Sequence, residues 1–213
     1  MKNLIIVGAG GFGREVLSYC FDIQKNNSDN NWHIIGFIDD NLNALNNYSY
    51  DISIIDTIKN YIPSNDDLFV MAIGLPTDQK ISIAESLVKR GAQFISLIHP
   101  TARVDQRAII GQGCIIAPYA GISCDTVLGN FVTLNAYSSV GHDSIIEDGC
   151  TISSYASIAG KVVLGTGVSV GLHGCVLPGC KIGNFAVIGS GSVVVKNVKA
   201  NSTVMGVPAK KII

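Results

Sequence analysis

His142 and Asp143 form the adjacent pair in this sequence that best fits general-base catalysis. A histidine changes its protonation near neutral pH, so it can accept a proton from a nucleophile during a reaction. A neighbouring carboxylate can orient the imidazole ring and stabilise the cation that forms. The alternative is an ordinary histidine at the surface or at a subunit interface, and the residues alone leave both interpretations open.

Near the N-terminus, Gly8, Gly10 and Gly13 have the Gly-x-Gly-x-x-Gly spacing of a phosphate-binding turn. Glycine lets the backbone approach a phosphate, and the N-terminus of a following helix attracts negative charge. Asp39 and Asp40 follow the next expected strand, where a ribose or base contact would fall. We expect a nucleotide or nucleotide-sugar site here, because the domain is too short for a complete dinucleotide fold. The alternative is a tight turn without a ligand.

The C-terminal half repeats every six residues. From residue 104 to residue 194, every sixth position is Ile, Leu or Val. The series is Val104, Ile110, Ile116, Ile122, Leu128, Leu134, Val140, Ile146, Ile152, Ile158, Leu164, Val170, Val176, Ile182, Ile188 and Val194. A helix would repeat its apolar positions near 3.6 residues and a flat strand at 2. A strict period of six predicts a parallel β-helix of hexapeptide repeats with these side chains facing its core.

This repeat predicts which residues stack. Three hexads make one coil, so residues 18 apart lie above one another on neighbouring strands. Gly160 lies 18 residues after His142, where its backbone N–H could hold an acyl oxygen. His173 lies 31 residues after His142, so the two histidines cannot share a column. The series predicts about five coils, and flat prism faces favour a cyclic homotrimer.

The first part of the chain alternates between strand-like and helix-like segments, which predicts a small parallel α/β sheet domain. Strands are expected over 3–7, 32–38, 68–73 and 94–98, and helices over 14–21 and 78–90. Pro100 restrains the joint with the repeat. We therefore expect an α/β domain over residues 1–98 and a β-helix over residues 99–213.

Composition narrows the class of protein. Of the 213 residues, 47% are hydrophobic and 15% are charged, which fits long buried faces and a buried subunit interface. The net charge of -1 indicates neither a nucleic-acid partner nor an anionic membrane partner. No apolar run approaches the ~20 residues of a membrane span. Cys114, Cys150 and Cys180 fall on inward positions of the repeat, which favours buried thiols in a reducing, cytoplasmic compartment over disulfides or metal ligands.

These features together resemble bacterial sugar O-/N-acyltransferases of the sialic-acid O-acetyltransferase type. The His99-Pro100 joint and the terminal segment Gly206-Val207-Pro208-Ala209-Lys210 add to the similarity. It extends over essentially the whole chain and is greatest to nucleotide-sugar N-acetyltransferases acting on UDP-4-amino sugars (bacillosamine) or GDP-perosamine. The resemblance implies a Rossmann-like N-terminal domain, a left-handed parallel β-helix, a homotrimer, acetyl-CoA as co-substrate and no metal.

The resemblance also implies roles for individual residues. His142 and Asp143 correspond to the base and its acidic partner, and Asn135 corresponds to an asparagine of the catalytic site. On the cofactor side, Gly160 corresponds to a glycine near the thioester, and Thr151 stands where some members carry a second histidine. The residues expected to bind the nucleotide sugar are Gly10, Gly11, Gly13, Asp39, Asp40 and Gly74.

The expected function is acetyl-CoA-dependent N-acetylation of a nucleotide-linked 4-amino-4,6-dideoxy sugar, for bacterial surface glycans such as O-antigen. UDP, GDP and dTDP all remain open as the nucleotide. One alternative is O-acetylation of sialic acid or another sugar. A second is a zinc hydratase on the same type of coil, against which the small number of histidines argues. A third is a non-catalytic partner of a sugar biosynthetic enzyme.

Overall fold

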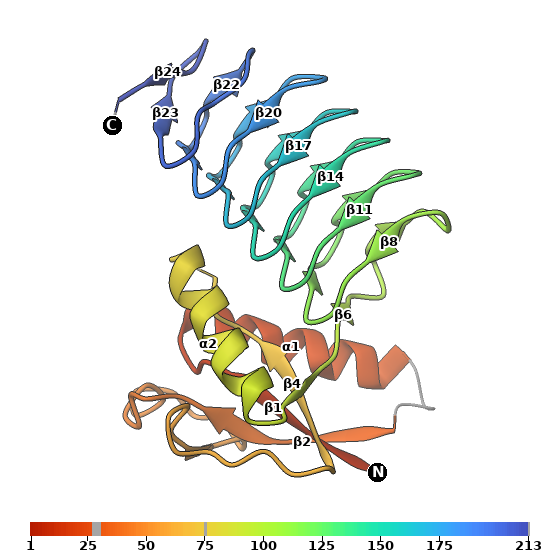
Figure 1. The fold of residues 1–213 in the computed structure, drawn as a ribbon. Helices are drawn as coiled ribbons and strands as arrows, with labels where there is room; N and C mark the ends of the chain where they lie inside the picture. The colour runs from red at the N-terminus through yellow and green to blue at the C-terminus, as the bar shows by residue number, and fades with distance from the viewer. Residues whose placement is uncertain (27–30, 75, 213) are drawn as a thin grey trace.

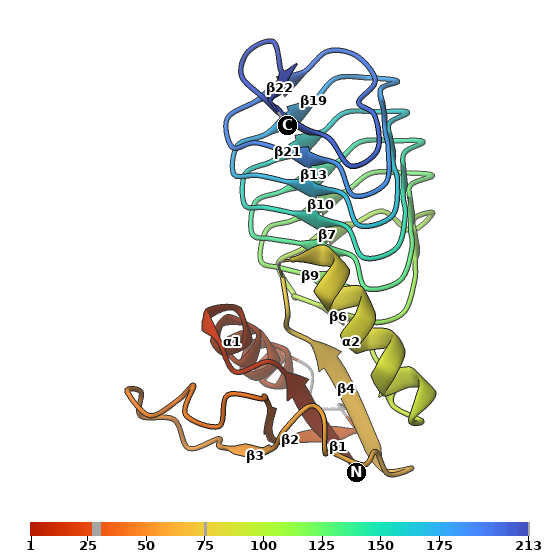
Figure 2. The same ribbon diagram turned by 60° about the vertical axis from the view of Figure 1, so that its left-hand side comes forward.

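A computed structural model describes residues 1–26, 31–74 and 76–212 of the chain. An α/β domain lies at one end of a long solenoid, and the C-terminus lies at the other end (Figure 1). The two helices of the α/β domain lie on either side of its central strands, and the first coils lie beyond them (Figure 2). The expected combination of a small parallel α/β domain and a β-helix is therefore confirmed.

The N-terminal domain contains one five-stranded parallel sheet and two helices. Its strands are β1 (Lys2–Val7), β2 (Trp32–Ile38), β3 (Ile54–Asp56), β4 (Asp67–Met71) and β5 (Gln93–Phe94). They lie in the order β3-β2-β1-β4-β5. The helices are α1 (Gly11–Asn26) and α2 (Thr77–Lys89). The three-residue strand β3 was not expected, because so short a segment has no readable periodicity.

The two helices cover opposite faces of this sheet. Leu4 and Ile6 of β1 pack in the same cluster as Val16 of α1. Ile5 and Val7 pack in the cluster that contains Ala84 and Leu87 of α2. Because both faces are covered, the central strands are continuously apolar, as is usual for buried parallel strands.

The solenoid starts at β6 and continues to the C-terminus. The first eight strands are β6 (Leu97–Ile98), β7 (Arg103–Val104), β8 (Ile109–Ile110), β9 (Ile115–Ile116), β10 (Gly121–Ile122), β11 (Val127–Leu128), β12 (Thr133–Leu134) and β13 (Ser139–Val140). The next eight are β14 (Ile145–Ile146), β15 (Thr151–Ile152), β16 (Ser157–Ile158), β17 (Val163–Leu164), β18 (Ser169–Val170), β19 (Cys175–Val176), β20 (Lys181–Ile182) and β21 (Val187–Ile188). The last are β22 (Val193–Val194), β23 (Thr203–Met205) and β24 (Lys210–Lys211). The chain thus leaves the first sheet at β5 and enters the solenoid at β6, beside the boundary proposed at residue 98.

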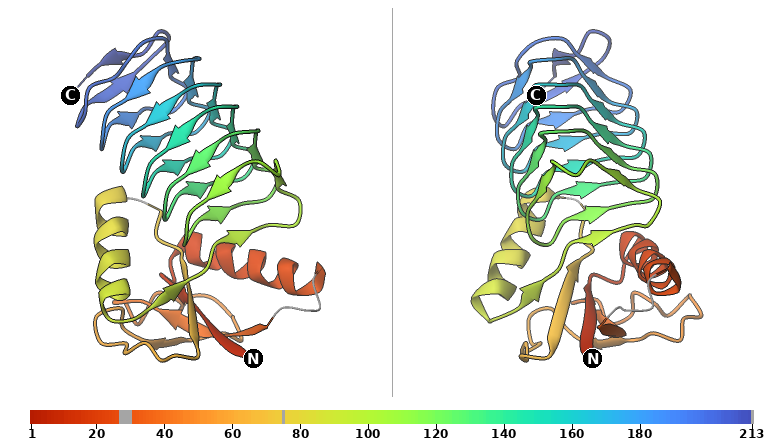
Figure 3. Two further views of the ribbon diagram at one scale, coloured as in Figure 1. Left: turned by 45° about the vertical axis from the view of Figure 1, so that its right-hand side comes forward. Right: turned by 90° about the vertical axis from the view of Figure 1, so that its right-hand side faces the viewer.

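From β6 to β22, every third strand of the solenoid belongs to the same sheet, and strands β7 to β21 contribute five strands to each of three sheets. Neighbours pair 18 residues apart, as Ser139 with Ser157 and Val140 with Ile158. The coils stack without interruption (Figure 3). The period-six aliphatic residues form one core, with Val104 and Ile110 only partly buried at its first coil. Cys114, Cys150 and Cys180 are buried, as expected from their positions in the repeat. None of the described helices is long and apolar enough to cross a lipid bilayer.

Candidate functional site

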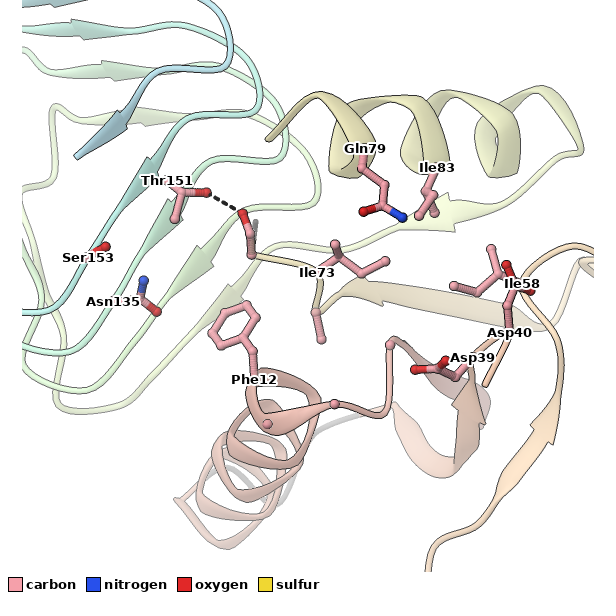
Figure 4. Close-up of a pocket in the computed structure, with 15 residues that line it drawn as sticks. Phe12, Asp39, Asp40, Ile58, Ile73, Gln79, Ile83, Asn135, Thr151 and Ser153 are labelled. Atoms are coloured by element: carbon pink, nitrogen blue, oxygen red, sulfur yellow. Dashed lines mark hydrogen bonds between the residues drawn. The ribbon is translucent and has the colours of Figure 1, made fainter. Parts of the chain in front are cut away.

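A cavity of about 490 Å³ opens between the N-terminal domain and the solenoid (Figure 4). The carboxyl ends of β1, β2 and β4, the start of α1 and the first half of α2 form most of its wall. Asn135, Thr151 and Ser153 of the solenoid form the rest. The β1 and β4 strands flank the point where the strand order reverses, which is where open α/β sheets bind ligands.

The glycine turn between β1 and α1 contains two kinds of position. A Cβ atom added to Gly10 would meet nothing within 4 Å, and one added to Gly11 would meet only Arg14, at 4.0 Å. The space beside these two glycines is open to a ligand at the N-terminus of α1. A Cβ on Gly13 would overlap the carbonyl of Gly8. Gly13 therefore packs the helix against the turn and does not line the cavity, which differs from its expected contact with the nucleotide.

The two acidic residues after β2 reach the cavity from one side. Asp39 accepts hydrogen bonds from the backbone N–H of Ala9 at 2.7 Å and of Asn41 at 2.8 Å. It therefore holds the glycine turn against the end of β2. The more exposed Asp40 accepts a hydrogen bond from the N–H of Lys59 at 3.1 Å. Both carboxylates line the cavity, at the place expected for a ribose or base contact.

The opposite wall joins the two domains. Thr151 is 2% exposed, and its hydroxyl donates a hydrogen bond to the carbonyl oxygen of Gly74 at 3.0 Å. The same hydroxyl accepts a hydrogen bond from Lys80 at 2.9 Å. Asn135 and Ser153 lie beside Thr151 on the solenoid wall (Figure 4). The structure thus places Thr151 between the domains, and its binding of the cofactor stays a prediction.

His142 and Asp143 lie on a corner of the solenoid after β13, outside this cavity. Nδ1 of His142 lies 2.7 Å from Oδ2 of Asp143. A carboxylate can only accept, so Nδ1 carries the hydrogen and Nε2 keeps a lone pair for a proton. This hydrogen bond holds the pKa of Asp143 below its usual value, with help from the positive charges of Lys161 and Arg107. Asp143 therefore remains an anion that can stabilise the imidazolium.

Gly160 lies next to the His142 ring, as the 18-residue stacking predicted. A Cβ on Gly160 would come within 2.6 Å of Nε2 of His142. In addition, the N–H of Lys161 donates to the carbonyl oxygen of His142 at 2.8 Å. The absence of a side chain at Gly160 therefore leaves room for the ring and keeps the backbone beside Nε2 accessible.

His173 belongs to a different corner, as predicted. Its ring stacks on that of Tyr155, with centroids 5.0 Å apart. The stack continues through Tyr137 and Tyr119 at 18-residue intervals. His173 is therefore the last member of an aromatic ladder and has no carboxylate partner among the ion pairs of the described residues.

The predicted site residues thus fall into two groups and one exception. Seven of them line the cavity: Gly10, Gly11, Asp39, Asp40, Gly74, Asn135 and Thr151. His142, Asp143 and Gly160 form the corner group, and Gly13 belongs to the packing of α1. The cavity can accept a ligand whose phosphates lie at the glycine turn, while the corner can remove a proton. Within the described part of the chain, no three His, Cys, Asp or Glu residues come together as a metal site.

Sequence reasoning missed Lys80, whose side chain is completely buried between α2 and the solenoid. The buried residues of α2 are Thr77, Lys80, Ala84 and Leu87, which is the spacing of one helical face. A lysine on the apolar face of a helix was therefore the available signal. Phe12 and Gln79, which also line the cavity, carried no comparable signal.

Two protein families match the chain. The PglD N-terminal domain matches residues 3–87, and the bacterial transferase hexapeptide (six repeats) matches residues 125–160. The UDP-N-acetylbacillosamine N-acetyltransferase of Bacillus subtilis (strain 168) is 31% identical over 120 residues, 54% of this chain and 51% of that protein. The GDP-perosamine N-acetyltransferase of Escherichia coli O157:H7 is 31% identical over 132 residues, 61% of this chain and 58% of that protein. The matched segments thus span between half and two thirds of these relatives' own lengths.

The likeness to a solved structure extends further. The acetyltransferase domain of PglB from Neisseria gonorrhoeae FA1090 has a TM-score of 0.89 and 26% identity, and covers 100% of both chains. The same domain has been solved in complex with acetyl coenzyme A, with a TM-score of 0.88, 27% identity and 99% coverage of both chains. The resemblance to bacterial sugar acyltransferases is therefore confirmed, with the N-terminal domain similar to the PglD N-terminal domain and part of the solenoid similar to bacterial transferase hexapeptide repeats.

Proposed function

We propose that this protein is an acetyl-CoA-dependent N-acetyltransferase that acts on the amino group of a nucleotide-linked sugar. The observation that carries the proposal is the His142–Asp143 hydrogen bond, which leaves Nε2 as a base directly beside Gly160. The two relatives named above are N-acetyltransferases whose names contain a UDP-linked sugar and a GDP-linked sugar. A cavity with a phosphate-type glycine turn fits a nucleotide as the other part of that substrate.

The reaction is a direct transfer. Nε2 of His142 removes a proton from the sugar amine as its nitrogen attacks the thioester carbonyl. The Asp143 carboxylate stabilises the imidazolium, and the backbone N–H at Gly160 donates to the oxyanion. Collapse of the tetrahedral adduct forms the amide and breaks the carbon–sulfur bond. The imidazolium then returns its proton to the sulfur, so CoA leaves as a thiol and His142 is neutral again.

We propose a homotrimer as the working form. Ile109, Val127 and Ile145 form an outward aliphatic stripe on the sheet of β8, β11 and β14, and are 63%, 37% and 46% exposed. This face borders the corner that carries His142, so a second copy packed there would enclose the acetyl-CoA site between subunits. A clean monomer in light scattering at micromolar concentration, with full activity, would contradict the trimer.

The acceptor sugar, its nucleotide and the biological role can be proposed more closely. A 4-amino-4,6-dideoxy sugar is the acceptor we favour, and bacterial surface glycan synthesis in the cytoplasm is the role. Asn135 lies on the cavity wall that faces the N-terminal domain, where it can orient the sugar. UDP, GDP and dTDP can be compared as free nucleotides in a thermal-shift panel, in which the matching nucleotide should raise Tm.

The decisive experiment compares an amine with a hydroxyl as the acceptor. The protein is incubated with acetyl-CoA and either a nucleotide-linked 4-amino sugar or its 4-hydroxy counterpart, and release of the CoA thiol is followed. We expect turnover with the amine and little with the hydroxyl. Turnover with the hydroxyl alone would replace this proposal by O-acetylation.

A further inference from the structure

Lys80 is the most unusual buried group outside the proposed chemistry. Its side chain has no exposed surface, although lysine is rarely buried completely. The ammonium nitrogen donates hydrogen bonds to Thr151 Oγ1 at 2.9 Å, to the Cys150 carbonyl at 3.2 Å and to Thr133 Oγ1 at 3.4 Å. No ion pair among the described residues involves Lys80. Its partners are therefore neutral oxygens of two adjacent coils.

Burying an ammonium group costs free energy because the group loses its hydration, and packing alone does not explain why a lysine lies here. Burial lowers the pKa of Lys80 to about 8, and the smaller electrostatic effects of Cys150 and Cys114 act in the opposite direction. An apolar side chain of similar volume would fill the same space without the loss of hydration. A lysine in this position is therefore best explained by what its three N–H groups fix.

The N–H groups of Lys80 hold a link between the two domains at the wall of the cavity. An ammonium group can only donate, so Thr151 Oγ1 must accept from Lys80 and direct its own hydrogen elsewhere. That hydrogen is donated to the Gly74 carbonyl, at the end of β4. Both Gly74 and Thr151 line the cavity. In the same turn of α2, Thr77 Oγ1 donates to the Gly167 carbonyl at 2.7 Å.

We infer that Lys80 is a positioning residue that sets the nucleotide-binding domain on the solenoid at the distance needed for acetyl transfer. It acts through Thr151 and Gly74 and touches no reacting atom. The inference rests on the proposed function, in which the N-terminal domain holds the nucleotide and the solenoid corner holds the base. Loss of the ammonium group should therefore affect the nucleotide sugar and leave the acetyl-CoA side nearly unchanged.

The test uses Lys80→Met, which keeps the length of the side chain and removes its donors. Lys89→Met is the matched control, because Lys89 is exposed on the same helix. We expect kcat/KM for the nucleotide sugar to fall about 100-fold in Lys80→Met, as for a small misplacement of reactants. KM for acetyl-CoA should stay within about twofold, and Lys89→Met should match the wild type. A folded Lys80→Met protein with wild-type kcat/KM would overturn the inference.

A second variant and a second readout keep the test decisive. Thr151→Val retains Lys80 and the shape of residue 151 but removes the hydroxyl link, so it should reproduce the fall in kcat/KM for the nucleotide sugar even if Lys80→Met does not fold. Hydrogen exchange of α2 should become faster in both variants. If the wild type transfers no acetyl group, the proposed function fails, and hydrogen exchange becomes the only test of the positioning role of Lys80. Unchanged hydrogen exchange in both variants would refute that role.

Discussion

The solenoid and the N-terminal domain place their candidate functional residues by different rules. In the solenoid, each coil repeats the last, so a residue's neighbours lie 18 positions away, as Gly160 lies beside His142. In the α/β domain, the candidate residues gather where strands end, as Asp39 and Gly74 do in the wall of one cavity. Sequence spacing therefore identifies neighbours in the first region, whereas strand order identifies them in the second.

The strictest test of the repeat is a charge placed on an inward position. Ile152 is completely buried, so Ile152→Asp should lower the free energy of unfolding by about 5 kcal/mol. Denaturant unfolding measures the change. The control is Ser157→Asp on the next strand, whose side chain is exposed and should tolerate the charge. Wild-type unfolding of Ile152→Asp would show that the assigned register is wrong.

The solenoid corner should carry most of the chemistry. His142→Ala should lower kcat by about 10²–10⁴-fold if general-base catalysis dominates. Binding of acetyl-CoA should change little, because the ring faces the amine. His173→Ala is the control and should keep most activity, since that ring belongs to the aromatic ladder. Near-normal turnover in His142→Ala would refute this mechanism and leave an amine that needs only orientation.

Lys80, at the contact between the two regions, should make the free energy of unfolding depend on pH. The pKa of Lys80 is about 8 in the folded protein, below its ordinary value of 10.5. Between these values the unfolded chain binds more protons, so this residue makes the free energy of unfolding rise with pH. From pH 7 to pH 10.5, the wild type should gain at most about 3 kcal/mol relative to Lys80→Met. Denaturant unfolding of both proteins across this range measures the difference, and a constant difference would contradict a buried ammonium.

The smallest effect is expected in the glycine turn. Gly11→Asp places a side chain and a negative charge in open space where a phosphate is expected. We expect the KM for the nucleotide sugar to rise about tenfold through charge repulsion, a cost of about 1.4 kcal/mol. The KM for acetyl-CoA should stay near its wild-type value. Equal increases in both KM values would argue against a separate nucleotide site in the N-terminal domain.

The solenoid and the corner that carries the proposed base could be predicted from the sequence alone. The period of six is a local property of the chain, and each hexad places an Ile, Leu or Val at the same inward position. Fold and register could therefore be predicted without knowing any distant contact. The column that joins His142 to Gly160 followed from that register. The glycine turn and Asp39 could also be predicted, because both lie at the end of a recognisable apolar strand.

The contact between the two regions, in contrast, is visible only in the folded protein. Gly13 has the spacing of a ligand-binding glycine, yet its neighbour is the Gly8 carbonyl, and spacing does not distinguish these environments. The contacts of Lys80 with Thr151 and of Thr151 with Gly74 span more than 70 residues along the chain. Such contacts arise when α2 docks on the coils, which is a matter of surface fit between two separately patterned regions. No periodicity within either region encodes that fit, so the wall of the cavity could be found only in the folded protein.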